Sequence, residues 1–556
     1  MNGPSQRLCL FTIAVCAIAI YAYPLVLRTP LLDPDEGLHA TIAQGMVERG
    51  DYLIPRVNGE PFRDKPFLYS AAQALSLRVF GMNEAAVRIP GFLFALLGAV
   101  TTVLLASRLF DGEAALYAAL AALTLVLPII LTQSPAHDVA LIPWTNLIVL
   151  SFWNQEQSGT TKQAWGWVAA MSVFIALAFL TKGLIGVAVI GTGLGLYSLV
   201  SRSITKAQIL RCSAALIGGA VLASPWYLTM EHASPGYLYY YFVDRHVLGY
   251  LTEGQEHGES GWYYYFGPVL GGAMPWLVFA TAAVMQLRYD VAKPGNRATL
   301  LLACWFIGGF IFLTAAGSKL LTYSLPLFPP IAILAGLGFR RFFHSEFAAA
   351  PRWLFVNGFR SAAIFGIVGP IPTLFILSKF LAAPSPPTAY GVAALASIAM
   401  AAGLVLFERQ QGRQALAVGM LWFPLIFICL MTWPMQVLAE LNSQRALAAL
   451  LNASDSMPNE IVLMGQRVGS VLFYLSPDKR KACENARIRE GLDSELKALI
   501  PPPPGTMIAV THKELKHNKC VAEMRALKPR VVGALNVVVG QPADAHVAER
   551  PERARE

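Results

Sequence analysis

Charged side chains are scarce in this sequence of 556 residues: 14% are Asp, Glu, Lys or Arg, while 55% are hydrophobic. A soluble domain carries about 25% charged residues, so the scarcity excludes an ordinary soluble protein. The alternation over about ten residues that marks a membrane barrel is also missing. The apolar residues instead form runs of about 20, the length of a membrane-spanning helix. The sequence therefore predicts an α-helical polytopic membrane protein.

A signal-peptide cleavage site is missing as well. The first apolar run, 8–27, has no small-residue site before Pro24 and is longer than a typical signal core. We therefore expect a retained anchor. The net charge of +9 is compatible with nucleic-acid binding, but Lys and Arg collect between the apolar runs. This distribution indicates membrane topology and no nucleic-acid partner.

The apolar runs predict about thirteen transmembrane helices. Placing the N-terminus in the cytoplasm puts most basic residues in cytoplasmic loops, and the odd number of spans puts the C-terminus in the periplasm. The first periplasmic loop, about 29–87, is long and contains two expected interfacial helices, 38–49 and 66–80. The second long periplasmic loop, 229–262, is rich in tyrosine, and we interpret most of its rings as an interfacial aromatic belt.

The character of the chain changes near residue 440. We expect a transmembrane domain over 1–438, a small periplasmic α/β domain over 439–541 with short strands near 461–464, 507–510 and 531–539, and a disordered tail over 542–556. Cys483 and Cys520 would lie in an oxidising compartment, where a disulfide is one possibility.

Polar residues at the predicted ends of spans converge on the periplasmic face. Ionisable groups near a bilayer are functional candidates because placing them there is costly. Taken singly, each has a structural explanation: Lys182 and Lys319 could extend toward the interface, and Asp138 could cap a helix. The candidates are Asp33, Asp35, Glu36, Asp64, Lys65, Asp138, Lys182, Arg245, His246, Lys319 and Tyr323.

Together these residue types suit an anionic substrate in a water-filled cavity. Lysine supplies a point charge for phosphate, and a carboxylate can orient or deprotonate an acceptor. Asp or Glu combined with His can hold a divalent cation.

At these residues the chain resembles the bacterial lipid A 4-amino-4-deoxy-L-arabinose transferases and their relatives in the protein O-mannosyltransferase superfamily, the GT-C glycosyltransferases. No single motif is specific, but their order and spacing are. The motifs are Asp33-Pro34-Asp35-Glu36-Gly37, Gly50-Asp51-Tyr52-Leu53-Ile54-Pro55-Arg56, Asn58-Gly59, Asp64-Lys65-Pro66, Phe179-Leu180-Thr181-Lys182-Gly183, Ser224-Pro225-Trp226-Tyr227, His246, and Lys319 to Tyr323 before Leu325-Pro326-Leu327-Phe328-Pro329-Pro330.

The resemblance implies an integral-membrane enzyme of the bacterial inner membrane with a periplasmic active site. Its donor would be a sugar on a polyprenyl phosphate such as undecaprenyl phosphate, and its acceptor lipid A or another periplasmic molecule. It would invert the anomeric centre by single displacement and act as a monomer. The implied roles are catalysis for Asp35, Asp138 and Lys65, phosphate or substrate binding for Lys65, Lys182, Arg245, Lys319 and Tyr323, and zinc binding for Asp64 and His246.

Two departures from the pattern concern this site. Asp64 stands where the motif usually has Glu, which weakens the metal assignment, and Gly249 is followed by Tyr250 instead of Arg. The sugar and the acceptor stay open, so a protein O-mannosyltransferase or another glycan transferase is an alternative. A lipid or sugar transporter would show internal repeats, and none is obvious. A non-catalytic binding protein would have no need to pair Asp35 with Lys65.

Overall fold

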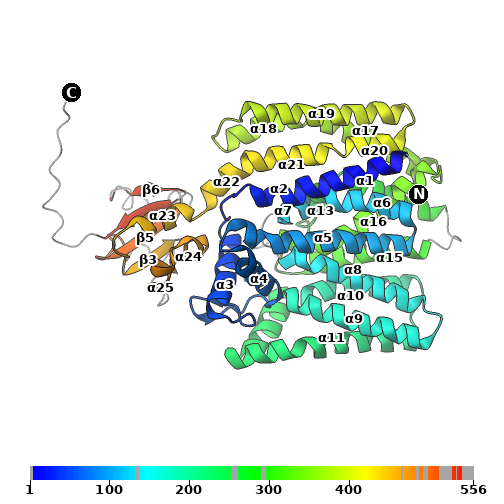
Figure 1. The fold of residues 1–556 in the computed structure, drawn as a ribbon. Coiled ribbons are helices and arrows are strands. Elements are labelled where there is room, and N and C mark those ends of the chain that lie inside the picture. Colours follow the sequence, from blue (N-terminus) through cyan, green and yellow to red (C-terminus); the bar gives the residue numbers. More distant parts are fainter. Residues whose placement is uncertain are drawn as a thin grey trace. The chain divides into compact units, whose positions relative to one another are not determined.

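The computed structural model divides into two compact units, each described by itself (Figure 1). Unit 1 comprises Met1–Arg28, Asp51–Pro55 and Pro61–Met435, and unit 2 comprises Thr29–Gly50, Arg56–Glu60 and Gln436–Glu556. The structure describes residues 4–132, 137–251, 261–289, 296–464, 468–483, 488–491, 499–511, 527, 529–533 and 535–540.

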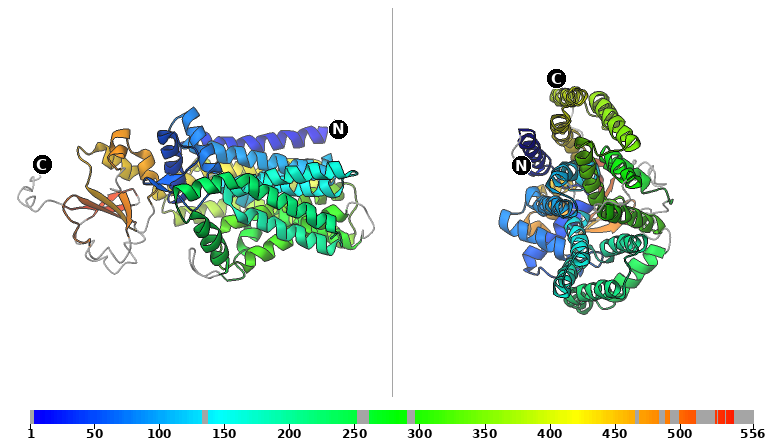
Figure 2. Two further views of the ribbon diagram at one scale, coloured as in Figure 1. Left: turned by 90° about the horizontal axis from the view of Figure 1, so that it is seen from below. Right: turned by 90° about the vertical axis from the view of Figure 1, so that its right-hand side faces the viewer.

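Unit 1 is built from helices that run side by side and are seen nearly end-on in the right-hand view of Figure 2. Its α-helices are α1 (Pro4–Ala17), α2 (Tyr23–Val26), α4 (Leu68–Phe80), α5 (Glu84–Leu109), α6 (Gly112–Thr124), α7 (Val126–Thr132), α8 (His137–Glu156), α9 (Thr161–Lys182), α10 (Leu184–Val200), α11 (Lys206–Ala233), α12 (Gly249–Leu251), α13 (Phe266–Ala273), α14 (Trp276–Met285), α15 (Asn296–Ala315), α16 (Phe328–Phe343), α17 (Ala349–Val368), α18 (Pro370–Phe380), α19 (Pro387–Glu408), α20 (Gly412–Gly419) and α21 (Trp422–Thr432). The π-helices are η1 (Ile18–Ala22) and η2 (Tyr239–Leu248), and the 3-10 helices are η3 (Gln286–Arg288) and η4 (Leu321–Leu327).

Eight helices among the described residues are long and apolar enough to cross a membrane, or up to eleven if three bent helix pairs each count as one span. The polytopic helical class is confirmed, whereas the predicted number of thirteen is not. Proline explains the bends, because its ring removes a backbone donor and clashes with the preceding turn. Pro128, Pro275 and Pro370 lie at or just after the breaks, where the paired helices bend by 54°, 98° and 52°.

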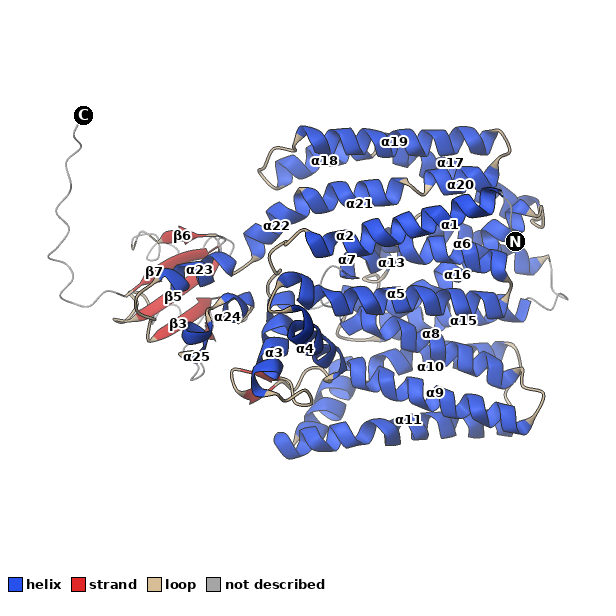
Figure 3. Cartoon of the chain, in the orientation of Figure 1, coloured by secondary structure: helices blue, strands red, loops and turns tan. Residues whose placement is uncertain are grey.

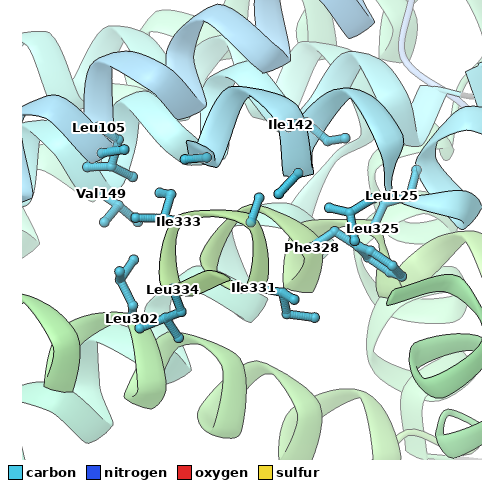
Figure 4. Packing of buried hydrophobic residues seen from close by; sticks show 14 of the residues in the cluster. Leu105, Leu125, Ile142, Val149, Leu302, Leu325, Phe328, Ile331, Ile333 and Leu334 are labelled. Carbon is cyan, nitrogen blue, oxygen red and sulfur yellow. The ribbon is translucent and has the colours of Figure 1, made fainter. Parts of the chain in front are cut away.

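The core of unit 1 surrounds α16. In the span Leu321–Phe343, 83% of the apolar window is buried, against 22% for α11, so α16 is central and α11 offers most of its surface to the surroundings. Figure 4 shows Ile333 of α16 beside Val149 of α8, and Leu334 of α16 beside Leu302 of α15.

Loops predicted to be cytoplasmic meet one another in ion pairs. The pairs are Arg340–Asp111 at 2.7 Å, Arg413–Glu113 at 2.9 Å, His344–Glu113 at 2.7 Å and Arg297–Glu156 at 2.7 Å. Side-chain caps begin the neighbouring helices: the Asp111 carboxylate accepts from the backbone of Ala114 and the Thr160 hydroxyl from that of Gln163. The loops that the charge pattern assigns to one side therefore lie together at one end of the helices.

Unit 2 contains a five-stranded mixed sheet in the order β4-β3-β5-β7-β6 (Figure 3). Its strands are β3 (Glu460–Met464), β4 (Ile488–Gly491), β5 (Thr506–Thr511), β6 (Arg530–Val532) and β7 (Leu535–Val539). β3 pairs in parallel with β4 and β5, and β7 pairs antiparallel with β5 and β6. The strands predicted from short apolar runs are therefore present.

Helices accompany this sheet. They are α23 (Arg445–Ala453), α24 (Ser470–Tyr474) and α25 (Pro477–Lys481); α22 (Pro434–Asn442) precedes them, and the two-residue strands β1 (Arg56–Val57) and β2 (Glu60–Pro61) pair with each other. Leu447 and Leu451 of α23 share an apolar cluster with Ile461 of β3. Cys483 is buried; Cys520 and the tail 542–556 lie outside the described residues.

The division of the first loop differs from the sequence expectation. The predicted boundary at 438–439 is close to Met435, but Thr29–Gly50 and Arg56–Glu60 group with the C-terminal residues. The first of these segments carries α3 (Asp35–Arg49). The hydrogen bonds responsible join residues more than 400 positions apart, a separation that local sequence patterns do not reveal.

Candidate functional site

Several elements of unit 1 end around a cavity of about 220 Å³. The loop before α4, the junction of α9 and α10, the π-helix η2 and the start of η4 each contribute to its wall. The polar lining residues are Asp64, Lys65, Lys182, Asp244, Arg245, His246, Ser318 and Tyr323, and the rest of the lining, with Ile185, Ala188 and Phe312, is mostly apolar. The cavity therefore combines a cationic wall with an apolar one.

Lys182 and Asp138 form a buried ion pair. Lys182 is the last residue of α9 and Asp138 the second of α8, and their side chains are only 4% and 8% exposed. A buried charge without a partner would be strongly destabilising, so each residue requires the other. Lys182 Nζ also lies 4.6 Å from the centre of the Tyr323 ring, a cation–π contact. Asp138 lies behind the lysine and is not among the described residues that line the cavity.

Gly183 permits the close packing of η2 against the end of α9. Its φ of +83° is in the left-handed region that side chains disfavour. A Cβ at this position would lie 2.2 Å from the Tyr241 hydroxyl and 3.2 Å from His246 Nε2. Any residue larger than glycine would therefore push both rings away from the junction of α9 and α10.

His246 is held neutral at the cavity wall. Its Nδ1 lies 2.5 Å from the Tyr241 carbonyl oxygen, so this nitrogen carries the proton and donates it. Burial, reinforced by the positive charges of Lys65 and Arg245, lowers the pKa of His246 to about 4. The imidazole therefore carries no charge at neutral pH.

Asp64 is the second predicted zinc ligand, and it lines the same cavity. Its Oδ1 accepts a hydrogen bond of 2.8 Å from Tyr240, and Arg245 Nη1 lies 3.6 Å away. Within the described ranges, no three His, Cys, Asp or Glu side chains gather as a metal-binding group. Because a guanidinium already neutralises Asp64, this donor set does not fit a closed metal centre.

The other predicted residues are placed differently. Lys319 is buried, its Nζ donates to the Ala316 carbonyl at 2.5 Å, and it is not among the cavity-lining residues that the structure describes. Asp35 is the exposed first residue of α3 and belongs to unit 2. The cavity thus unites Asp64, Lys65, Lys182, Arg245, His246 and Tyr323 from the predicted set.

The sequence analysis missed buried tyrosines near the end of α9, where the Tyr241 hydroxyl donates to the Lys182 carbonyl at 3.4 Å. Tyr237 and Tyr241 are fully buried, so a belt does not describe them, whereas Tyr239 is exposed as a belt requires. The spacing of four residues between Tyr237 and Tyr241 is a helical signal that would have placed both on one face.

Comparisons with known proteins agree with this geometry. The family described as dolichyl-phosphate-mannose-protein mannosyltransferase matches residues 64–228, a range that includes Asp64, Lys65, Asp138 and Lys182. The aminoarabinose transferase of Shewanella sediminis is 31% identical over 58% of each chain, and that of Erwinia tasmaniensis is 26% identical over 74% of this chain and 72% of the relative. The resemblance to the GT-C superfamily is confirmed.

Solved structures support the GT-C fold. ArnT from Cupriavidus metallidurans, crystallised with undecaprenyl phosphate, has a TM-score of 0.74 at 21% identity, covering 95% of this chain and 97% of that one. The oligosaccharyltransferase AglB of Archaeoglobus fulgidus has a TM-score of 0.51 at 10% identity, covering 97% of this chain and 75% of that one. The sequence match to the Shewanella relative covers 58% of that relative's length, which is less than two thirds.

Proposed function

We propose that the chain is an inner-membrane glycosyltransferase that moves a sugar from a polyprenyl phosphate to a periplasmic acceptor, most simply lipid A. One observation carries this proposal: Lys65, Lys182 and Arg245, from three separate elements, line one cavity. Asp138 and Asp64 hold Lys182 and Arg245 in place at this cavity, and lysine and arginine are the side chains that bind phosphate in proteins. The names of the aminoarabinose transferases supply the donor class, a sugar on undecaprenyl phosphate, and the resemblance of the sequence motifs supplies lipid A as the acceptor.

The apolar surroundings suit the lipid part of such a donor. A second cavity of about 230 Å³ is lined by Phe179, Tyr227, Phe242 and other apolar residues, and it shares Leu184 with the cationic cavity. A phosphate bound at the cations would place an isoprenoid chain against this apolar wall. Burial of such a chain contributes about 0.8 kcal/mol for each buried CH₂ group.

The cations promote departure of the lipid phosphate. Negative charge grows on the phosphate oxygen as its bond to the anomeric carbon breaks, and positioned cations stabilise that charge. The acceptor oxygen attacks the same carbon from the opposite face, so the configuration inverts. The resemblance of the first-loop motif, not a contact with the cavity, assigns the proton of the acceptor to Asp35. No side chain of the enzyme is bonded to the sugar during this displacement.

The proposed orientation follows from the positive-inside pattern. The N-terminus lies in the cytoplasm, and the cavity and the sheet-containing residues 439–541, an α/β domain, lie in the periplasm. We propose thirteen crossings in total, of which some are made by the short or bent helices of unit 1. Reporter tags after Arg341 and at the C-terminus test this arrangement, because both tags on one side of the membrane would overturn it.

Asp35→Asn is the decisive variant. The amide cannot accept the proton, and we expect transfer to fall by roughly 100- to 10,000-fold, the usual contribution of a general base. Asp51→Asn is the matched control, because Asp51 is another first-loop acid whose carboxylate only accepts from the backbone of Leu53 and Ile54. Full activity of Asp35→Asn in reconstituted vesicles would refute the catalytic assignment.

The acceptor has one specific alternative. The mannosyltransferase family matched over residues 64–228 favours a protein acceptor as the second candidate. Mass spectrometry of lipid A and of periplasmic proteins from a deletion strain, compared with the parent strain, distinguishes the two. A mass difference confined to glycoproteins would select the second.

Zinc binding by Asp64 and His246 stays a prediction, and no step above depends on a metal. A neutral imidazole is the form that binds zinc, but Arg245 competes for Asp64. Metal analysis of the purified protein and of His246→Ala tests the prediction. An equal zinc content in both would remove His246 from the ligand set.

A further inference from the structure

Within unit 2, the first-loop helix α3 is connected to C-terminal residues near both of the helix's ends. Near its start, the Leu31 amide donates to the Tyr474 hydroxyl at 2.9 Å. Near its end, Glu48 pairs with Arg480. The helix that begins with Asp35 is therefore part of the C-terminal fold.

Asp33 makes the most concentrated of these connections. Its Oδ1 accepts from the Ser470 amide at 2.6 Å, and its Oδ2 accepts from the Ser470 hydroxyl at 2.5 Å and the Gln444 amide at 2.9 Å. Its own amide donates to the Asn442 carbonyl at 2.9 Å. One residue of the first loop thus bonds two separate C-terminal segments, before α23 and at the start of α24.

Two glycines make this approach possible. A Cβ at Gly37 would lie 2.0 Å from Asp33 Oδ1 and 2.2 Å from the Ser470 amide, and a Cβ at Gly469 would lie 2.0 Å from the same Oδ1. The Thr41 hydroxyl, about one turn along α3 from Gly37, donates to the Gly469 carbonyl at 3.1 Å. The first turns of α3 and α24 are thus in backbone contact around the Asp33 carboxylate.

The three acids of the sequence Asp33-Pro34-Asp35-Glu36 differ in their surroundings. Glu36 is buried and its Oε2 accepts from the Leu32 amide at 2.7 Å, which closes the turn. Burial raises the pKa of Asp33 to about 6, so its carboxylate is still ionised at neutral pH and suited to accept three hydrogen bonds. Asp35 is the exposed acid, two residues from Asp33 and in the same turn.

We propose that Asp33, held by Ser470 and Gln444, is a positioning residue that sets the orientation of the Asp35 carboxylate. This inference rests on the proposed role of Asp35. The inference gives the C-terminal segment an indirect role in catalysis, because Gln444 and Ser470 supply the donors that orient the helix turn carrying Asp35. Small displacements of a catalytic group greatly reduce the rate while leaving substrate binding intact.

The test compares kcat and KM for the polyprenyl-phosphate donor in the reconstituted full chain. Asp33→Asn replaces an acceptor oxygen by a donor, and we expect kcat to fall by roughly 100-fold with KM changed less than about twofold. Ser470→Ala removes only the hydroxyl, and we expect a decrease of roughly 10-fold that Ser470→Thr reverses. If Asp33→Asn does not fold, the comparison of Ser470→Ala with Ser470→Thr tests the same inference.

Arg480→Ala is the matched control. It breaks the ion pair with Glu48, which joins the same two segments at the other end of α3. If Asp33 served only to hold these segments together, Arg480→Ala and Asp33→Asn would lower kcat equally. We expect its kcat to stay within about twofold of the parent. An unchanged kcat in both Asp33→Asn and Ser470→Ala, or an equal loss in Arg480→Ala, would overturn the inference. Full activity of Asp35→Asn would instead refute the proposed role of Asp35, on which this inference rests, and absence of transfer by the parent chain would refute the proposed function.

Discussion

The helix α8 carries an acid near each end, and the two acids show how differently the ends of unit 1 are built. Asp138, near its start, pairs with Lys182 where both side chains are less than 10% exposed. Glu156, its last residue, pairs with Arg297, whose side chain is 50% exposed. The two ion pairs of α8 therefore differ in what they do for the structure. The pair of Glu156, 11% exposed, with Arg297 joins the ends of α8 and α15, whereas the buried pair keeps a cation beside a cavity.

The largest expected effect at the cavity end is that of Lys65→Met. Loss of a cation that stabilises the leaving phosphate should lower the transfer rate by roughly 100- to 1,000-fold. Initial rates in vesicles measure this effect. Lys379→Met is the control, because Lys379 also lies at a helix end but contacts the Phe375 ring instead of the cavity. Equal losses in both variants would remove the distinction between cavity and span-end lysines.

The buried pair should show strong coupling in a double-mutant cycle. Asp138→Asn alone leaves Lys182 without compensation and should lower the free energy of unfolding by roughly 3–5 kcal/mol. Asp138→Asn combined with Lys182→Met should recover most of that stability while transfer stays low. Thermal melts and rates on the same samples test this, and additive single effects would contradict the buried pair.

A smaller effect is expected at the glycine that joins α9 to α10. Gly183→Ala forces a side chain into the left-handed region and against Tyr241 and His246, and should destabilise the protein by roughly 1–3 kcal/mol. Gly166→Ala, in the interior of α9 where a Cβ meets open space, should be neutral or slightly stabilising. Similar melting temperatures for the two variants would rule out the close packing of η2.

The smallest effect is expected at the opposite end. Arg297→Ala removes the half-exposed partner of Glu156, which keeps a hydrogen bond of 3.0 Å from the Tyr197 hydroxyl, and should change stability by about 1 kcal/mol. Transfer should stay within about twofold of the parent. A large loss of activity would show that this end takes part in the reaction.

Sequence patterns predicted the elements of this fold but not its long-range assembly. Hydropathy identified the helical membrane class, and short apolar runs identified β3 and β5. The bends at Pro128, Pro275 and Pro370 made the number of spans uncertain, because each half-helix is apolar by itself. Lys182, His246 and Tyr323 were recognisable as candidates because polar residues are rare among such runs.

What the sequence did not reveal depends on tertiary contacts. Lys319 donates to the nearby Ala316 carbonyl, and its assignment as a phosphate ligand stays a prediction. Asp33 was recognisable from the sequence only as one of several first-loop acids, whereas its partners come from residues more than 400 positions later. No periodicity within a window of helix length contains such information.

The hydrogen bonds of Asp33 also impose an order of events during biosynthesis. Asp33 and Ser470 are separated by 437 positions, which takes roughly 20 to 90 s to translate at ordinary rates. During that interval the helices of unit 1 can enter the membrane while the first loop still lacks the donors that orient α3. If Asp35 has its proposed role, a nascent or truncated chain that ends before Ser470 carries the cationic cavity without an oriented base, and we expect it to be inactive until synthesis is almost complete.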